Sequence, residues 1–116
     1  MRLIVAGSRG IAYSITKQVL DNHPWIPEAT ELVCGCARGV DNDAKAILHV
    51  DKHLPVKDFP ADWDGLGKRA GYVRNEEMAD YADALIAIWD GDSKGTKHMI
   101  DLAEKKGLKV SVVRIN

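Results

Sequence analysis

Short apolar runs alternate with segments of helical period from one end of the chain to the other. Residues 2–6 and 84–89 are almost wholly apolar, which is typical of strands buried on both faces. Between them, Ile11, Ile15 and Val19 recur every four residues, as on one face of a helix that stops before Pro24. The alternation therefore predicts strands that are connected through helices.

Five strands and about four helices follow from this pattern. Strands are predicted at residues 2–6, 31–34, 56–59, 84–89 and 109–115, with helices near 11–23, 39–52, 68–82 and 96–106. Crossover connections of this length join parallel strands. The predicted fold is α/β, a three-layer Rossmann-like fold in one domain over residues 1–116, with a five-stranded parallel sheet. Ligands of such sheets bind at the carboxyl edge.

Composition excludes several classes of protein. Sixteen Lys and Arg against seventeen Asp and Glu give a net charge of −1, so the chain lacks the positive field of a non-specific duplex binder. With 46% hydrophobic and 28% charged residues, the chain is too apolar to be disordered. No apolar run reaches the ~20 residues that a bilayer crossing needs. We expect a cytoplasmic protein without a membrane partner.

The two cysteines stand close together as Cys34-Gly35-Cys36. This spacing is too tight for a routine structural disulfide, and no second Cys or His pair stands at zinc-ligand spacing. His49 and His53 are four residues apart but lack a third ligand. We therefore expect reduced thiols, no metal and no cofactor.

Three loops combine glycines with basic and polar side chains, and each precedes a predicted helix. They are Gly7-Ser8-Arg9-Gly10, Cys34-Gly35-Cys36-Ala37-Arg38-Gly39-Val40-Asp41 and Asp90-Gly91-Asp92-Ser93-Lys94-Gly95-Thr96. Glycines let backbone amides approach a ligand, helix N-termini favour anions, and the arginine fork fits phosphate. We expect a phosphate-bearing ligand where the three loops meet. The alternative is tight turns with solvated Arg9 and Lys94, and with Asp41 and Asp90 as caps or turn residues.

Further candidate site residues lie in the loop before the third predicted helix and in its first turns. Its inward stripe starts with the polar residues Arg74 and Asn75, which is typical of a site rather than a core. In the loop before it, Trp63 could stack on a base or pack against a helix, and Asp62 is the candidate catalytic base. Lys68 contacts phosphate or is solvated.

Five motifs stand in one order along nearly the whole chain. They are Gly7-Ser8-Arg9; Gly35-Cys36-Ala37-Arg38-Gly39-Val40-Asp41; Phe59-Pro60-Ala61-Asp62-Trp63; Gly71 with Arg74-Asn75 and Met78; and Trp89-Asp90-Gly91 with Ser93-Lys94-Gly95-Thr96. The set resembles the YspA/YpsA-related branch of the SLOG superfamily, which includes the Lonely Guy phosphoribohydrolases and the DprA nucleic-acid-binding proteins. The resemblance implies a nucleotide pocket at the carboxyl edge and a homodimer or larger homo-oligomer. It also implies a small protein of the kind found in phages and mobile elements, in a superfamily proposed to sense or process nucleotide signals.

One position departs from the Lonely Guy pattern. These enzymes resemble one another in a P-G-G-x-G-T-x-x-E loop, whose carboxylate is needed to cleave the N-glycosidic bond. Gly95 and Thr96 match that loop, but Met99 takes the place of the carboxylate, and a thioether does not exchange protons. The departure favours binding over catalysis.

We therefore expect a protein that binds a small phosphorylated nucleotide-type ligand, as a sensor or a sequestering protein. The alternatives are a nucleotide hydrolase of the glycosidic or phosphoester bond, with Asp62 or another loop carboxylate as base, and single-stranded nucleic-acid binding. The net charge argues against the last. The base, the number of phosphates and a cyclic or linear form stay open. The predicted ligand-binding residues are Gly7, Ser8, Arg9, Gly35, Arg38, Gly39, Asp41, Asp62, Trp63, Lys68, Arg74, Asn75, Asp90, Gly91, Ser93, Lys94, Gly95 and Thr96.

Overall fold

The computed structural model describes residues 1–115. Its strands are β1 (Arg2–Gly7), β2 (Glu31–Cys34), β3 (Val56–Asp58), β4 (Ala84–Trp89) and β5 (Lys109–Arg114). All of them pair in parallel, in the order β3-β2-β1-β4-β5. The predicted five-stranded parallel sheet is confirmed.

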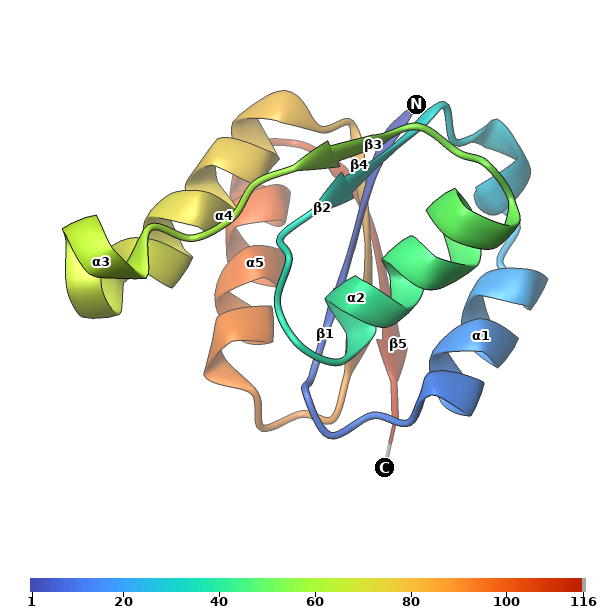
Figure 1. Ribbon diagram of the computed structural model, residues 1–116, viewed down its shortest axis with the longest axis horizontal. Coiled ribbons are helices and arrows are strands. Elements are labelled where there is room, and N and C mark those ends of the chain that lie inside the picture. Colours follow the sequence, from blue (N-terminus) through green and yellow to red (C-terminus); the bar gives the residue numbers. More distant parts are fainter. Residues whose placement is uncertain (116) are drawn as a thin grey trace.

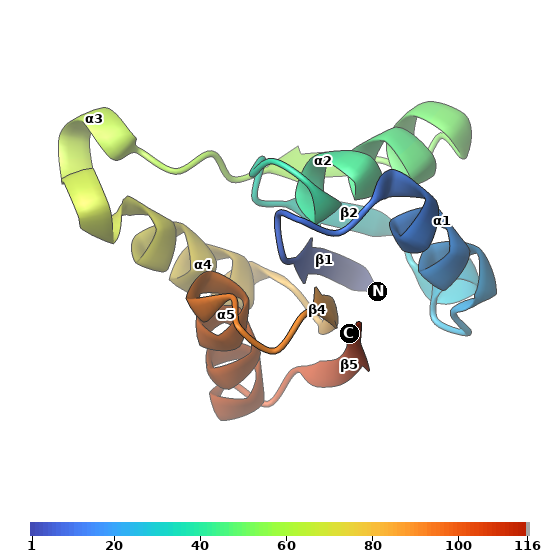
Figure 2. The same ribbon diagram turned by 90° about the horizontal axis from the view of Figure 1, so that it is seen from below.

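Four main helices cover this sheet on both faces. They are α1 (Tyr13–Asn22), α2 (Val40–Lys45), which continues as the π-helical segment η2 (Ala46–Asp51), α4 (Ala70–Tyr81) and α5 (Lys94–Lys105). Figure 2 shows α1 and α2 on one face of the sheet and α4 and α5 on the other. The predicted three-layer arrangement is therefore confirmed. None of these helices is both long and apolar enough to span a bilayer.

Side chains of β1 alternate between two hydrophobic cores. Leu3 and Val5 pack in the core beneath α1 and α2, whereas Ile4 and Ala6 pack in the core beneath α4 and α5. All four are buried. A strand that is buried on both faces is apolar at every position, which explains the unbroken apolar run at this end of the chain.

Several predicted boundaries shift by one or two residues for identifiable reasons. The third strand ends at Asp58 rather than at residue 59: the Phe59 amide still donates to the Cys34 carbonyl at 2.7 Å, but Pro60 after it has no N–H to continue a ladder. The first helix begins at Tyr13 rather than at Ile11, which packs in the core ahead of the helix. The third main helix begins at Ala70 rather than at residue 68.

The segment predicted as a loop over residues 60–67 contains a short helix. This helix, α3 (Trp63–Leu66), is followed by a 3-10 turn, η3 (Gly67–Arg69). Asp62 caps it, because its Oδ1 accepts a hydrogen bond of 2.9 Å from the Gly65 amide. A further 3-10 turn, η1 (Ile26–Glu28), precedes β2. In Figure 1, α3 lies apart from the sheet, at the end of α4.

The strand order reverses direction at β1. The chain builds β1, β2 and β3 outward to one edge, then crosses back to place β4 on the other side of β1. Loops leaving the carboxyl ends of β1, β2 and β4 therefore diverge at this point, which is where open α/β sheets form their ligand crevice.

Candidate functional site

Two adjoining cavities lie at the carboxyl edge of the sheet. The first, which we call the α4 cavity, has a volume of about 230 Å³ and is lined by Gly71, Tyr72, Arg74, Asn75 and Met78 of α4 together with the loops after β1, β2 and β4. The second, the β2-loop cavity, has a volume of about 560 Å³ and is lined by residues 35–38 together with Pro60 and Ala61. Both are lined by Arg9, Ala37, Trp63 and Arg74, so the two cavities form one continuous crevice.

Three arginines from three different segments line the β2-loop cavity. Arg9 follows β1, Arg38 follows β2, and Arg74 comes from α4. Arg9 and Arg38 are exposed, and within residues 1–115 none of the three forms an ion pair with a carboxylate. Guanidinium groups that converge without an ion pair are suited to attract an anion, and their planar forks suit phosphate oxygens.

Arg74 is held in place by the chain around it. One Nη1–H donates a hydrogen bond to the Gly35 carbonyl, and Nε donates to Asn75 Oδ1 at 3.0 Å. The first bond connects α4 to the loop after β2, and the second orients the side chain along its own helix. Arg74 therefore presents its remaining donors from a fixed position, which lowers the entropy lost on binding.

Asp41 is a buried carboxylate beside these arginines. It lines the α4 cavity, is 6% exposed, and its Oδ2 accepts a hydrogen bond of 3.4 Å from the Ala37 amide. Burial raises its pKa to about 6, and the positive charges of Arg74 and Arg9 oppose this rise. The N-cap position of α2 is Gly39, so Asp41 closes the preceding loop rather than capping the helix. The site thus contains a carboxyl group that changes charge near neutral pH.

The loop after β1 and the start of α2 are packed closely together. Gly39 has a φ of +82°, and a Cβ placed there would lie 2.8 Å from the Arg9 carbonyl oxygen. A side chain at this position is therefore strained by its backbone and by its neighbour. The close approach brings Arg9 and Arg38 to the same cavity.

Asn75 joins α4 to the start of α5. Its Nδ2 donates to His98 Nδ1 at 3.1 Å and to the Gly95 carbonyl at 3.4 Å, and the residue is buried. His98 packs edge-on against Tyr72, and burial lowers the pKa of its ring. A neutral ring accepts this hydrogen bond at Nδ1. The hydrogen bonds of Asn75 thus hold Gly95 and Thr96 at the wall of the α4 cavity.

Ser8 and Asp90 shape the loops behind the crevice. Ser8 is buried, and its Oγ accepts a hydrogen bond of 3.1 Å from the Asp90 amide. Asp90 Oδ1 accepts from the amides of Asp92 at 2.8 Å and Ser93 at 2.9 Å, and these bonds hold its pKa below the usual range. Both side chains are used by the protein itself, so they position the site without lining it.

Trp63 overhangs the crevice from α3. Its side chain is 53% exposed, and a Cβ placed on Gly71 would lie 3.3 Å from Trp63 Cη2. The indole therefore packs closely against the first turn of α4 at Gly71, where a larger residue would displace the ring by a few tenths of an ångström. An exposed aromatic face at the rim of a cavity is a surface on which a planar base can stack.

Comparison with curated proteins decides the family. The chain is 31% identical over 116 residues to the gene 61 protein of Mycobacterium phage D29, and the match covers 94% of this chain and 93% of the phage protein. The chain belongs to the gene 61 protein family. No family model matches it.

A solved structure shares the fold of this gene 61 family protein. The X-ray structure of DNA processing protein A (DprA) from Streptococcus pneumoniae matches with a TM-score of 0.79 and 16% identity. The match covers 99% of this chain but 50% of the DprA chain, so the gene 61 family protein corresponds to half of that protein's length. A DprA-like Rossmann fold is therefore confirmed.

Most of the predicted binding residues line the crevice of the gene 61 family protein. Those that line one or both cavities are Gly7, Arg9, Gly35, Arg38, Asp41, Trp63, Lys68, Arg74, Asn75, Ser93, Gly95 and Thr96. Those that line neither are Ser8, Gly39, Asp62, Asp90, Gly91 and Lys94. Of the three helix starts expected to converge, α2 and α5 do so, whereas no residue of α1 lines either cavity. Ligand contact by these residues stays a prediction.

Some lining residues were not among the predicted ones. Gly71 and Met78 lie one turn before and after Arg74 and Asn75 on α4, so helical spacing alone could have added them. Ala37 lies between two predicted residues of its loop. Met99, which stands at the Lonely Guy carboxylate position, is 1% exposed and packs in the core beneath α4 and α5.

Proposed function

We propose that the crevice binds a small phosphorylated nucleotide-type ligand, and that the protein acts as a sensor or a sequestering protein for it. The convergence of Arg9, Arg38 and Arg74 on one cavity, with no ion pair to any of them in residues 1–115, carries this proposal. Three guanidinium groups offer enough donors for the oxygens of one or more phosphates.

The two cavities suggest how such a ligand lies. The phosphate would occupy the β2-loop cavity with the arginines. The nucleoside would extend into the α4 cavity, which has the apolar wall atoms of Ala6, Gly71 and Met78 and the exposed indole of Trp63 at its rim. A pocket with an apolar wall and few polar groups is the usual form of a small-ligand site.

We further propose that the gene 61 family lies within the YspA/YpsA-related branch of the SLOG superfamily. The order of the five motifs along the chain and the DprA-like fold support this placement. Assembly as a homodimer or a larger homo-oligomer is part of the same proposal. Light scattering of the purified chain at micromolar concentration tests it, and a monomer contradicts it.

Ligand recovery tests the proposed function. The purified protein is incubated with a mixed nucleotide extract, desalted and denatured, and the released compounds are identified by mass spectrometry. The proposal expects an intact nucleotide at near-stoichiometric amount. Arg9→Ala and Arg38→Ala each weaken binding of that nucleotide by about 10- to 100-fold, the range of a charge-assisted hydrogen bond.

Arg69→Ala is the matched control for these arginine variants. Arg69 is an exposed arginine of η3 that lines neither cavity, so its removal changes the net charge equally. Its affinity should equal that of the unaltered protein. Equal losses in all three variants would mean that overall charge, not the crevice, determines binding.

Asp41 supports a second candidate function, hydrolysis of a nucleotide. Its carboxyl group is buried beside two arginines, and its pKa of about 6 suits a general acid or base near neutral pH. In that case the recovery experiment yields free base and sugar phosphate, or nucleoside and phosphate, in place of the intact ligand. Asp41→Asn would abolish this turnover.

The name of DNA processing protein A raises nucleic acid as a third ligand class. Binding through the phosphate backbone weakens steeply as salt rises. We expect single-stranded DNA to bind less tightly than the recovered nucleotide, and the net charge of −1 supports this. Tighter binding of the DNA, with a steep salt dependence, would contradict the small-ligand proposal.

A further inference from the structure

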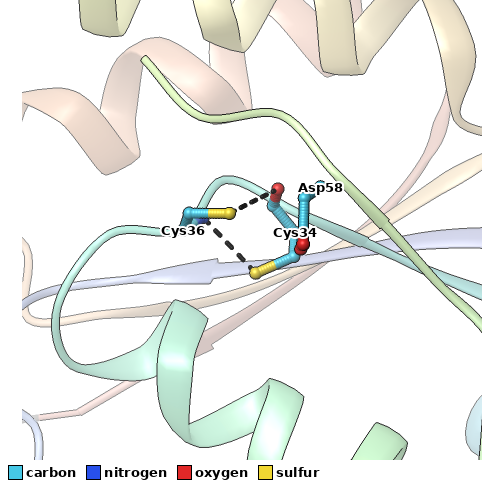
Figure 3. A group of neighbouring side chains, drawn as sticks. All are labelled: Cys34, Cys36 and Asp58. Carbon is cyan, nitrogen blue, oxygen red and sulfur yellow. Dashed lines mark hydrogen bonds between the residues drawn. The ribbon is translucent and has the colours of Figure 1, made fainter.

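Two thiols and a carboxylate gather at the carboxyl ends of β2 and β3. Cys34 is the last residue of β2 and pairs in register with Asp58, the last residue of β3. Cys36 follows two residues later. The two Sγ atoms and a carboxylate oxygen of Asp58 all lie within 4.8 Å of one another, and Figure 3 shows the three side chains together.

The loop after β2 turns back on itself, so that the Cys36 sulfur lies beside the Cys34 sulfur. Cys36 has a φ of +61°, a backbone conformation that residues other than glycine rarely adopt. Its amide donates to Cys34 Sγ at 3.3 Å, and its own thiol donates to the Cys34 carbonyl at 3.7 Å. Both cysteines are free thiols. The backbone therefore holds the two sulfurs and the neighbouring carboxylate in one cluster.

The dimensions of this cluster suit a tetrahedral thiolate-bound metal. Tetrahedral zinc with Zn–S bonds of about 2.3 Å has its ligand atoms about 3.8 Å apart. The three donor atoms are within 4.8 Å of one another. Side-chain rotations that move these atoms by about 1 Å or less would bring them to that spacing. Three protein ligands leave a fourth position for water or another ligand.

The surroundings of the cluster balance its charge. Two thiolates and a carboxylate carry three negative charges, and a divalent cation leaves one of them uncompensated. Lys45 Nζ lies 3.0 and 3.1 Å from the two carboxylate oxygens of Asp58 and supplies the missing positive charge. The thiol protons leave to solvent as the metal binds.

We propose that Cys34, Cys36 and Asp58 form a three-ligand site for a thiophilic divalent cation of the Zn²⁺ type. Thiolates select such cations over Mg²⁺ and Ca²⁺, which prefer oxygen ligands. Cys36 also lines the β2-loop cavity, so the proposed site borders the cavity that the three arginines line. A water or an anion in the fourth position would complete the coordination sphere.

Titration with Co²⁺ tests the site on the full chain, kept reduced with a phosphine and free of nucleotide. Tetrahedral Co²⁺ absorbs in the visible range, and thiolate ligation adds a charge-transfer band in the near ultraviolet. We expect both to saturate at one Co²⁺ per chain and to disappear when Zn²⁺ is added. Absence of the charge-transfer band overturns the proposal, whatever ligand the crevice binds.

Two variants and a control define the ligand set. Cys36→Ser removes the charge-transfer contribution of one thiolate, and Asp58→Asn weakens Co²⁺ binding by about tenfold or more. Asp64→Asn alters an exposed carboxylate of α3 outside the cluster and leaves binding unchanged. Circular dichroism confirms that each variant is folded. Unaltered affinity in folded Asp58→Asn overturns the three-ligand assignment, because the metal then binds without the carboxylate.

Discussion

The Asp41 carboxylate and the Arg74 guanidinium lie against the same face of Gly35. A Cβ placed on this glycine would be 2.7 Å from Asp41 Oδ2 and 3.1 Å from Arg74 Nη1. Because Gly35 has no side chain, the Asp41 carboxylate of α2 and the Arg74 guanidinium of α4 can approach each other across the loop after β2. The shape of the crevice therefore depends on a residue that has no side chain.

We predict that Gly35→Ala disturbs the crevice and the stability together. The added methyl displaces both side-chain ends, which lowers the free energy of unfolding by about 1–3 kcal/mol. It also weakens binding of the nucleotide recovered by mass spectrometry, because Arg74 loses its position. Gly10→Ala is the control, since a Cβ there meets no atom within 4 Å. Denaturant unfolding and calorimetry measure the two effects, and equal behaviour of the two variants would contradict the prediction.

Asp41 predicts an unusual dependence of stability on pH. Its pKa rises from about 3.9 in the unfolded chain to about 6 in the folded protein, so the folded state holds this proton more tightly. The free energy of unfolding contributed by this group therefore falls as pH rises from about 4 to about 6. Asp41→Asn lacks the titration, so its stability relative to the unaltered protein increases by up to about 3 kcal/mol over that range. Parallel pH profiles from denaturant unfolding would show that Asp41 is not the cause.

Ser8→Ala is predicted to destabilise the protein without removing a lining residue. Ser8 Oγ accepts the Asp90 amide, and without it this N–H loses its partner in a part-buried position. The expected loss is about 1–3 kcal/mol in the free energy of unfolding. Ser14→Ala removes an exposed hydroxyl from α1 and serves as control. A thermal unfolding midpoint that is the same in both variants would exclude the proposed role of Ser8.

Two variants of Asp62 distinguish a capping role of this residue from a catalytic one. Asparagine also caps helices, so Asp62→Asn keeps α3 intact, whereas Asp62→Ala costs about 1 kcal/mol of local helix stability. Hydrogen exchange at the Gly65 amide, which donates to Asp62, reports the difference. We expect faster exchange in the alanine variant alone. Loss of nucleotide turnover in Asp62→Asn, with unaltered exchange, would instead assign Asp62 as the base.

The layers and the location of the crevice could be predicted because they depend on periodicity. An inward helical stripe that begins with Arg74 and Asn75 must place both near the sheet edge, and the structure has them there. The short helix α3 has too few residues to show a period, so the sequence predicts a loop there. The capping role of Asp62 therefore has no signal in the sequence, which predicts only ligand binding or catalysis for this residue.

The roles of single polar residues depend on neighbours that are distant in sequence. Ser8 and Arg9 are adjacent in one loop, yet Ser8 is buried against the Asp90 amide and Arg9 lines both cavities. Likewise, Asp58 joins the two cysteines only because β3 pairs with β2 in register. Strand order and register are not encoded in local patterns, so the third member of that cluster had no sequence signal.

The central position of β1 also determines when the crevice can exist during synthesis. β1 pairs with β2 from Arg2 and Glu31, but it gains its second neighbour only when Leu3 meets Ala84. A nascent chain that ends before β4 has an open edge on β1. Such long-range pairing makes folding slow relative to helical proteins of this size. The core beneath α4 and α5 also needs Leu85 of β4 and Met99 of α5, so the crevice beside it is complete only when nearly the whole chain has been made.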